Sequence, residues 1–504
     1  MPIENTYYMR RFIFLLVTVS LLLSNSLAAQ EGVARKLTLQ EVIGLAQDYS
    51  LQSLLAKHRF RNSYWQYRSY KANYLPSVSL TADPVNLQRA ITKDLVFENG
   101  EWVEKYAPTN NLNSSMSLEA SQNVTFTGGR IFVASELGRL DLLNDDPATL
   151  MSTPISIGFS QPLFGFNEFK WQKKIEPKQY EEAKKQYLSS MEDVNARAVT
   201  YFFDLALEQM NVKTSEFNKA NSDTLYQIAK GRFELGMIDQ GDLMQMELNL
   251  LTSTDQLVKD KLNLEVKKSN LRTFLGFTDN INIELITSLD VPEITVDVIQ
   301  AMQRARENSP EILSMQVDIL TAEQNLAKTK ADSRFNASLL ASYGLTQRAI
   351  DLPDVYKDPQ QSQRLNIGVT IPILDWGMRR GKVKMAISNL DLTNVNVQQQ
   401  MIDFEQQVYL DIMQFNMQDE QLRLAAKTDT ISRTRYDITK QKFMIGKVDV
   451  LKLNDALTQK DKAIANYMSA LRTYWTNFYT VRKTTLWDFE KNCPLEQDYD
   501  ELIR

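Results

Sequence analysis

The sequence has almost no histidine or cysteine, two side chains that many enzyme active sites use. Among its 504 residues it contains one histidine, His58, and one cysteine, Cys493. A single cysteine cannot form an internal disulfide, and His58 has neither the ligand neighbours of a zinc site nor the partners of a catalytic triad. The sequence also lacks a phosphate-binding loop and a dinucleotide-binding fingerprint. We therefore predict that the chain is not an enzyme, with no catalytic residues, no cofactor and no metal site, and we interpret His58 as a surface or packing residue.

Long apolar runs and a strong charge of one sign are also missing. After Leu23 no long uncharged apolar run occurs, and the mean hydropathy is −0.33, so we predict no membrane-spanning helix. The formal net charge is −5, with 24% charged residues of both signs, which gives no basic surface for nucleic acid. An exported chain can still cross a membrane as β-strands.

The N-terminus does carry one short apolar run, and this run predicts export. Met9-Arg10-Arg11 precedes the run from Phe12 to Leu23, and the small residues Ser24 to Ala29 follow it. A positive, an apolar and a small-residue region in this order are typical of a secretory signal peptide, here residues 1–29. The run is shorter than the about 20 residues of a spanning helix, so an uncleaved anchor is the weaker interpretation.

Glycine and proline are scarce as well, with 17 and 14 residues, and they leave long stretches without helix breakers. Neither occurs from Lys382 to Ile445; if this stretch is one helix, it is roughly 96 Å long at about 1.5 Å per residue. The first half has a counterpart from Lys178 to Lys230, after Pro177. Helices of this length are plausible only in a coiled-coil-like or tubular assembly. Partner stretches without glycine or proline are Asp242 to Leu275 and Lys447 to Cys493.

The same pattern occurs in both halves of the chain. The segment Phe233 to Asp239 matches Phe443 to Asp449, 210 positions later, without a gap. Further upstream, Ser50 matches Ser309 at a spacing of 259. The difference between the two spacings places an insertion of 49 residues between Leu80 and Ile157 in the first half. A long period that is used only twice argues against a solenoid and indicates a duplicated structural unit.

Each matched segment is the hinge of a predicted helical hairpin. Gly236 and Gly446 are placed to end the first helix, because glycine tolerates the left-handed conformation found there. Asp239 and Asp449 are placed to cap the start of the second helix. Each half is therefore predicted to contain one long helical hairpin, preceded by a shorter helix, at about Leu39 to Leu75 and Val298 to Arg334.

Alternating sequence predicts strands at the other end of each hairpin. Apolar residues alternate with small polar residues around Leu80, Ile157 and Ile367. Such strands fit either a wall between lipid and water or a small antiparallel sheet packed on the helices, and composition leaves both open. Within the insertion, Ser115 to Phe126 and Arg130 to Leu140 flank a Gly-Gly turn, which favours two additional strands over an extracellular cap. The segments predicted to be loops are Asp83-Pro84, Asn99-Gly100, Asp145-Asp146-Pro147 and Pro353 to Pro359.

Together these features resemble the TolC family of outer-membrane efflux proteins, over nearly all of the mature chain. The resemblance rests on the duplicated halves, on hairpin tips with a glycine, and on two strand-to-helix junctions, Gln161-Pro162-Leu163-Phe164 and Ile371-Pro372-Ile373-Leu374-Asp375-Trp376-Gly377. It implies a mainly α fold with a β-barrel module. Duplicated long helical hairpins would form an α-barrel, and strands of three chains would share one outer-membrane β-barrel. The junction residues singled out are Pro162, Pro372, Trp376 and Gly377.

The resemblance also implies a function. The chain would be a passive outer-membrane exit duct for small molecules or proteins, in a tripartite efflux or a type I secretion system. Its partners would be two further copies of itself, a periplasmic adaptor, an inner-membrane pump and outer-membrane lipid. Strand number supports oligomerisation independently, because one chain offers about four to six strands and a closed barrel needs about eight. The adaptor would dock at the helical tips, formed by Gly236, Met237, Ile238, Gly446, Lys447 and Val448.

In the family, acidic rings narrow the periplasmic end of the tube just after the second tip. Counted from Gly446, the matching positions are Lys452 and Asp455. The resemblance therefore implies a constriction with one acidic ring, while the lysine departs from the family pattern. The alternative is that Lys452 and Asp455 form an ordinary i, i+3 ion pair, worth a few tenths of a kcal/mol.

Aromatic residues gather where strands are predicted to meet helices. They form either a belt at the membrane interface or ordinary packing at the junction, and both interpretations stay open. These residues are Tyr70, Tyr74, Phe164, Phe166, Phe169, Trp171 and Trp376.

After the signal peptide we expect a first repeat at 30–276 with strands at about 77–163, a linker at 277–295, a second repeat at 296–486 and a tail at 487–504. Two other functions are weighed against the channel. A periplasmic adaptor also has a helical hairpin, but the duplication and the missing Gly-rich lipoyl-like modules argue against it. An exported coiled-coil structural protein would show sustained heptads without strand modules.

Overall fold

The computed structural model describes residues 35–98, 100–143, 148–277, 281–287, 291–292 and 294–503. The predicted signal peptide and the predicted loop at Asp145 to Pro147 lie outside these residues. The chain divides into two compact units. The helical unit contains the residues up to Lys57, Leu188–Ala305 and Val408–Gln497, and the sheet unit contains His58–Tyr187, Arg306–Gln407 and the residues from Asp498 onward.

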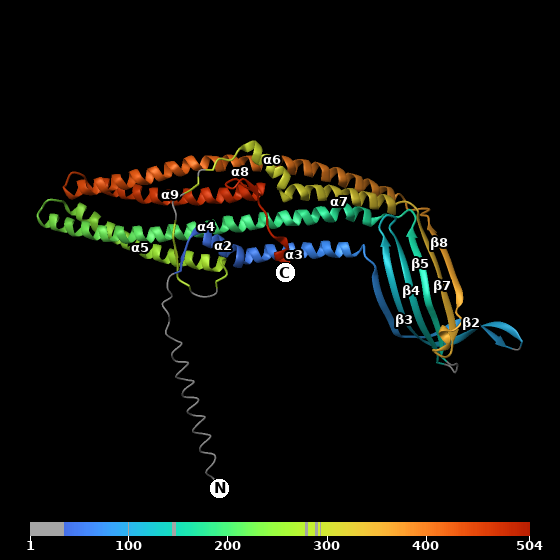
Figure 1. Cartoon of the computed structure of the whole chain (residues 1–504). Coiled ribbons are helices and arrows are strands. Elements are labelled where there is room, and N and C mark those ends of the chain that lie inside the picture. Colours follow the sequence, from blue (N-terminus) through green and yellow to red (C-terminus); the bar gives the residue numbers. More distant parts are fainter. Residues whose placement is uncertain are drawn as a thin grey trace, which may run out of the picture. The chain divides into compact units, whose positions relative to one another are not determined.

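The helices repeat between the halves at the predicted spacings. The shorter helices α2 (Leu39–Tyr49) and α3 (Leu51–Ala72) correspond to α6 (Val298–Asn308) and α7 (Pro310–Asp332). The long helices α4 (Glu168–Glu234) and α8 (Met378–Met444) are followed by α5 (Gln240–Phe274) and α9 (Val450–Thr485). Figure 1 shows the two helical hairpins that these helices form, which confirms the prediction. Among the described residues, no helix has the length and apolar character needed to span a membrane.

Each shorter helix predicted as continuous is in fact two helices, so this prediction was wrong. The breaks fall at Ser50 and Ser309, which occupy matched positions in the halves. Ser50 is extended, with φ −65° and ψ 143°, and its Oγ accepts from the amide of Ser53 at 3.1 Å. Ser309 caps α7 in the same way, and Pro310 disfavours a helical conformation in the residue before it. Serine therefore starts a new helix in both halves.

Two long helices have other ends than expected. α4 runs through Pro177 and begins at Glu168, although a proline inside a helix removes one hydrogen bond and costs about 3 kcal/mol. Beside the proline, Ile175 is buried and Lys178 Nζ donates to Gln316 Oε1 on α7 at 2.7 Å. α9 ends at Thr485 instead of continuing to Cys493, because Leu486 turns into the left-handed region with φ 47°.

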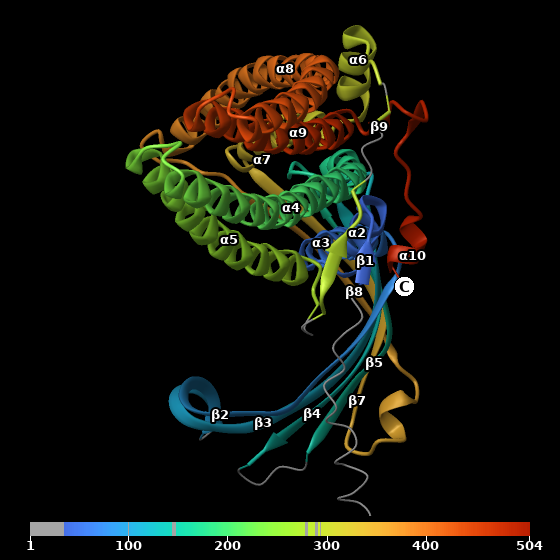
Figure 2. The same cartoon turned by 90° about the vertical axis from the view of Figure 1, so that its left-hand side faces the viewer.

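Six antiparallel strands form one sheet in the order β2-β3-β4-β5-β7-β8. The strands are β2 (Ser77–Glu98), β3 (Glu101–Val124), β4 (Gly129–Leu142), β5 (Thr149–Pro162), β7 (Asn336–Ala349) and β8 (Gln360–Thr370). The insertion supplies β3 and β4, which confirms the two additional strands, and Gly128 in their turn has φ 78°. Figure 2 shows the six strands side by side, with the β2–β3 ribbon extending past the others.

The register of this sheet separates two faces. Leu80 pairs with Leu118, Ile157 with Tyr343, and Leu365 with Ala341, so that apolar residues follow one another across one face. The opposite face carries mainly small and polar residues, with Phe132 and Leu340 as exceptions. Leu80, Ile157 and Leu365 are 64%, 52% and 71% exposed in the single chain, so the apolar face is not packed on helices. The alternative of a small sheet packed against the helices is therefore wrong.

The prediction of a loop at Asp83-Pro84 was wrong. Both residues lie within β2, where the register shifts between Asp83 and Asn86. β2 is an edge strand, so one of its sides has no neighbouring strand. A proline is tolerated at an irregular position of such a strand, because the N–H that it lacks is not needed for pairing there. Gly100 does lie in a turn, with φ 90°, while Asn99 is outside the described residues. The segment from Pro353 to Pro359 contains a single 3₁₀ turn, η1 (Asp354–Tyr356), whose Val355 is fully buried.

Short strands and one short helix complete the two units. In the helical unit, β1 (Arg35–Leu37) pairs in parallel with β6 (Ile283–Leu285), and β9 (Trp487–Asp488) pairs with β10 (Cys493–Pro494). The core of this unit includes the fully buried aromatic residues Phe202, Phe415 and Tyr474. In the sheet unit, the C-terminal α10 (Tyr499–Ile503) packs on α3, where Arg61 Nε donates to the Leu502 carbonyl at 2.6 Å.

Candidate functional site

The two helical tips have the same backbone turn. Gly236 has φ 70° and Gly446 has φ 76°, the left-handed conformation predicted for both. The amide after each glycine reaches back to a carbonyl of the last helical turn: Met237 N donates to Arg232 O at 2.8 Å, and Lys447 N donates to Lys442 O at 2.9 Å. This is the closing pattern of a helix that ends in a left-handed glycine.

The helices that leave the tips start on the predicted caps. The Asp239 side chain accepts from the amide of Asp242 at 2.8 Å, and the Asp449 side chain accepts from the amide of Lys452 at 2.8 Å. A capping aspartate satisfies an amide that has no partner within its own helix. The two turns are therefore fixed by the same pair of residue types.

An apolar cluster joins the two tips within the helical unit. We call it the tip cluster, and it consists of Leu225, Ala229, Met246, Tyr436, Phe443, Val450, Leu453 and Ala456. Ile238 and Val448, two of the residues predicted to form the docking tips, pack against it and are only partly exposed. Since branched apolar side chains next to a glycine turn can fold back on the core, sequence alone did not reveal their direction. Met237 and Lys447 do lie on the surface.

The outer surface of the tips carries apolar residues that sequence reasoning missed. Leu235, Ile445 and Leu451 are 73%, 65% and 73% exposed, close to the 71% of Met237. Between the two turns lies a pocket of about 370 Å³, lined by Arg232 and by residues of both hairpins. Arg232 also donates to the Met444 carbonyl at 2.8 Å and so links one tip to the other. The sequence did contain a signal for this surface, because Leu235 and Ile445 occupy matched positions directly before each glycine.

Lys452 and Asp455 do not pair with each other. Lys452 Nζ lies 3.8 Å from an oxygen of Asp449, and Asp455 forms an ion pair with Arg435 on α8. The proposed i, i+3 pair between Lys452 and Asp455 is therefore wrong. Both side chains are more than half exposed, so they place a positive and a negative charge on the surface of α9 near the second tip.

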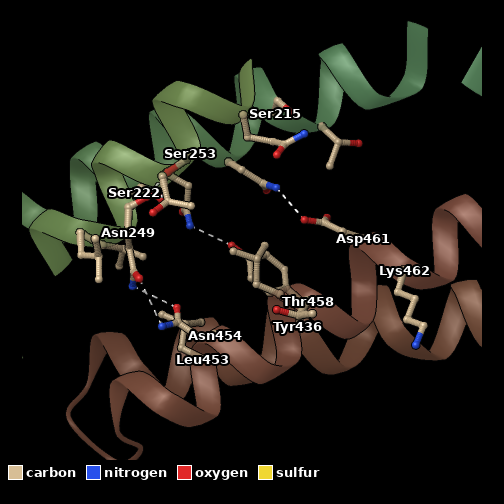
Figure 3. A pocket seen from close by; sticks show the side chains of 18 of the residues that line it. Ser215, Ser222, Asn249, Ser253, Tyr436, Leu453, Asn454, Thr458, Asp461 and Lys462 are labelled. Atoms are coloured by element: carbon tan, nitrogen blue, oxygen red, sulfur yellow. Dashed lines mark hydrogen bonds between the residues drawn. The ribbon is translucent and has the colours of Figure 1, made fainter. Parts of the chain in front are cut away.

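Above the tip cluster, a polar seam connects the two hairpins. It borders a cavity of about 770 Å³, shown in Figure 3. Three amide side chains reach across it from the first hairpin: Asn249 donates to Asn454 at 3.1 Å, Asn218 to Asp461 at 2.8 Å and Asn221 to the Tyr436 hydroxyl at 2.8 Å. Burial raises the pKa of Tyr436 to about 12, so this hydroxyl stays protonated at neutral pH.

A cluster of charged residues that was not predicted from the sequence lies where α9 ends. Arg482 donates to Glu192 at 3.0 Å and to Asp488 at 2.6 Å, and all three are largely buried. Burial raises the pKa of Glu192, against the opposing effect of the Arg482 charge. Burial alone would lower the pKa of Arg482, but the two carboxylates hold it above its usual value. The cluster fixes α4 to the end of α9.

The strand-to-helix junctions lie in the sheet unit. Pro162 ends β5, and Pro372 follows β8 by two residues. Trp376 is 91% exposed with φ 53°, and Gly377 has φ 87°. Asp375 accepts from the amides of Gly377 and Arg379 at 3.0 and 3.2 Å and so caps α8.

Some of the aromatic residues predicted at the junctions contact one another. The Tyr74 hydroxyl donates to the Tyr70 hydroxyl at 2.9 Å, and the Tyr74 ring meets Phe169 edge-on at 6.2 Å between centroids. Phe164 instead packs on Phe335, with centroids 4.9 Å apart. Across the described part of the chain, no group of three histidine, cysteine or acidic side chains is placed to hold a metal ion. The arrangement offers surfaces and turns rather than a reacting centre.

Comparisons with known proteins agree with this geometry. The sequence profile of a family described as "Outer membrane efflux protein" matches residues 106–277 and 301–485, more than half of the chain. A search among curated proteins finds no match. The fold is similar to the CmeC outer membrane channel of Campylobacter jejuni, with a TM-score of 0.66 and 16% identity over 92% of this chain and 88% of that one. It is also similar to the outer membrane protein VceC of Vibrio cholerae, with a TM-score of 0.62 and 10% identity over 91% and 97%.

A third similar structure is the open state of the MtrE outer membrane channel of Neisseria gonorrhoeae. Its TM-score is 0.61, with 13% identity over 91% of this chain and 90% of that one. At these identities the structures establish a shared fold, in which long helical hairpins are combined with a strand sheet.

Proposed function

Because the chain belongs to the outer membrane efflux protein family, we propose that it forms a passive exit duct that carries material from the periplasm across the outer membrane. Members of this family are channels rather than enzymes, and the fold is the TolC-like combination of long helices and a strand sheet. The observation that carries the proposal is the two-faced sheet. Its apolar face is exposed in the single chain and suits lipid, and its polar face suits water.

The sheet supports an oligomer, which we propose is a homotrimer. β2 and β8 are the two edge strands, and open edges cannot face lipid. Six strands are too few for a closed transmembrane barrel, whereas three such sheets joined edge to edge would give eighteen. Membrane barrels of about this size enclose an aqueous channel.

The tips support docking of a periplasmic adaptor, which would link the duct to an inner-membrane pump. Exposed apolar side chains gather there around the pocket between the turns. Large apolar side chains exposed at one place on a surface mark an interaction site. We assign docking to Met237 and Lys447 together with Leu235, Ile445 and Leu451, while Gly236 and Gly446 set the turns that present them. Ile238 and Val448 support the surface from behind.

We place the narrow part of the duct just above the second tip, at Lys452 and Asp455. Three copies of α9 would bring three carboxylates and three ammonium groups around one axis. Their fields would partly cancel, so the proposed constriction is weakly cation-selective. A tripartite efflux system fits these features, and type I secretion would use the same duct with another pump.

We further propose that residues 1–29 are removed on export. The mature chain then consists of the repeats at 30–276 and 296–486, the linker at 277–295 and the tail at 487–504. The sheet lies in the outer membrane, and the helical hairpins extend into the periplasm.

A matched pair of substitutions tests the two-faced sheet. Leu365→Lys places a charge on the apolar face of β8, where it costs about 2–4 kcal/mol in the middle of a membrane. Asn366→Lys, one residue further, places the same charge on the polar face. We expect the first variant to be lost from isolated outer membranes and the second to remain there as a trimer when sized in detergent. Equal recovery of both variants as monomers outside the outer membrane would contradict the proposed function.

A further inference from the structure

Each half of the chain forms a groove between the helix pair beside the sheet, and the two grooves differ in size. The groove between α3 and α4 has a volume of about 300 Å³, and its counterpart between α7 and α8 has about 650 Å³. The spacings of 259 and 210 residues relate one groove to the other. Three matched amide positions are Gln66, Gln179 and Gln186 in the first groove and Asn325, Asn389 and Asn396 in the second.

The first groove is filled by its own side chains. Tyr67 and Tyr180 stack across it, with ring centroids 4.5 Å apart and an angle of 6° between the rings. Glu176 adds a third long side chain, and burial raises its pKa. At the corresponding positions the second half has Leu326, Leu390 and Ala386. These shorter side chains leave the second groove open.

The open groove is lined by side chains that both donate and accept hydrogen bonds. On α8, Asn389, Thr393, Asn396 and Gln400 follow one another at about one residue per helical turn. Thr321 and Asn325 face them from α7. Amide and hydroxyl groups in a row match the alternating N–H and C=O groups of an extended peptide backbone.

Two positions along the groove carry opposite charges. α7 leads into β7 and α8 follows β8, and Asn336 pairs with Thr370, so the two helices run antiparallel away from the sheet. Lys382 therefore lies at the sheet end, opposite Thr329 of α7, and Asp318 precedes Thr329 by 11 residues (329 − 318 = 11), about 16 Å along α7 at about 1.5 Å per residue. The groove continues along α8 past the level of Asp318, to Asn396 and Gln400. Within the described residues, neither side chain has an ion-pair partner within 4 Å. The residues at the corresponding sequence positions of the first half, Gln172 and Arg59, do not line the first groove and do not repeat this polarity.

We propose that the groove between α7 and α8 binds a short extended peptide with free termini, its carboxylate at Lys382 and its ammonium at Asp318. Five extended residues span about 16 Å at 3.3 Å per residue, which matches the separation of the two charges. A volume of about 650 Å³ is ordinary for a ligand site. A neutral glycan would use the amides but leave both charges unused. This site goes beyond the proposed duct and involves neither the tips nor the adaptor.

Calorimetric titration of the purified full-length protein with penta-alanine tests the site. Amidating the peptide C-terminus should weaken binding about tenfold, the effect of one charge-assisted hydrogen bond, and acetylating the N-terminus should do the same. Lys382→Gln should weaken binding of the free peptide about tenfold, and amidating the peptide should then have no further effect on its affinity. In the Asp318→Asn variant, acetylating the peptide should not change its affinity, whereas amidating it should still weaken binding. This crossed pattern assigns each terminus to one residue.

Matched substitutions in the two grooves are the control. Asn389→Leu should weaken binding, whereas Gln179→Leu at the corresponding position of the first groove should not. Ala386→Glu restores the side chain that occupies the first groove and should abolish binding, while sizing in detergent shows that the protein still assembles. The proposal is overturned if penta-alanine does not bind, if free and blocked peptides bind equally, or if N,N′-diacetylchitobiose binds in place of the peptide. Because the assay measures binding and not export, such a failure leaves the proposed duct untouched.

Discussion

The two halves of the chain are most alike at the helical tips and least alike beside the sheet. At the tips, Gly236 and Gly446 differ by only a few degrees in φ, and an aspartate caps the next helix in both. Beside the sheet, the tyrosine pair Tyr67 and Tyr180 fills one groove, and the other is open. A tight turn permits few residue types, because its backbone sets the choice, whereas a helix surface permits almost any. Duplication therefore preserved the turns and allowed the helix faces to diverge.

The largest effect is expected at Arg482, which joins the second half to the first. Arg482→Ala leaves the carboxylates of Glu192 and Asp488 buried without their cation, at a cost of about 3–5 kcal/mol. The control is Arg197→Ala, which removes an exposed i, i+4 pair with Asp193 worth about 0.3–0.5 kcal/mol. Guanidinium denaturation at one protein concentration measures both. Similar midpoints for the two variants would mean that the Arg482 cluster is solvated and does not connect the halves.

Much of this fold follows from the sequence, and the exceptions have physical causes. The hairpins and their turns were predictable, because the absence of glycine and proline and the pairing of glycine with aspartate act locally. The break at Ser50 was not predicted, because an isolated serine is compatible with a helix and becomes a cap only when its hydroxyl receives an amide. Pro177 lies inside α4, although a proline locally predicts a helix boundary, so the local pattern placed the start of this helix too late.

The candidate site was predictable in part for the same reason. The glycines at the tips were found, since their conformation is dictated by the turn. The direction of Ile238 and Val448 was not, because it depends on a cluster assembled from both hairpins. The pairing of Asp455 with Arg435 was also missed, because the two residues lie on different helices. Contacts between distant segments are the part that spacing alone cannot supply.

A smaller effect is expected from alanine at the tip glycines, and it tests whether the two turns are equivalent. Gly236→Ala and Gly446→Ala should each cost about 1–2 kcal/mol, because no atom lies within 4 Å of the added carbon and only the left-handed backbone is strained. Gly231→Ala is the control, and it should change the free energy of unfolding in the opposite direction. This glycine lies inside α4, and an added carbon there would meet open space. It should stabilise by about 0.5–1 kcal/mol. Chemical denaturation measures all three, and a large difference between the two tips would show that their likeness is only geometric.

The smallest effect concerns charge, where the two halves differ at matched positions. Lys452 and Asp455 on α9 correspond to Asp242 and Gln245 on α5. If α9 lines the duct, Lys452→Asp in a trimer replaces three positive charges by three negative ones and should raise cation preference. Asp455→Ala should shift selectivity towards anions, more weakly, because it changes the charge of each chain by one unit, whereas Lys452→Asp changes it by two.

Asp242→Lys, the reverse exchange in the first half, separates the two helices. Reversal potentials of single channels in a planar bilayer under a salt gradient measure each variant. We expect the two α9 substitutions to move the potential in opposite directions and Asp242→Lys to leave it unchanged. If Asp242→Lys has the larger effect, α5 rather than α9 faces the conduction path, since the charge on each helix is changed at the same height. If none of the three moves the potential, the charges lie on the outer surface of the tube and the narrow part of the duct is elsewhere.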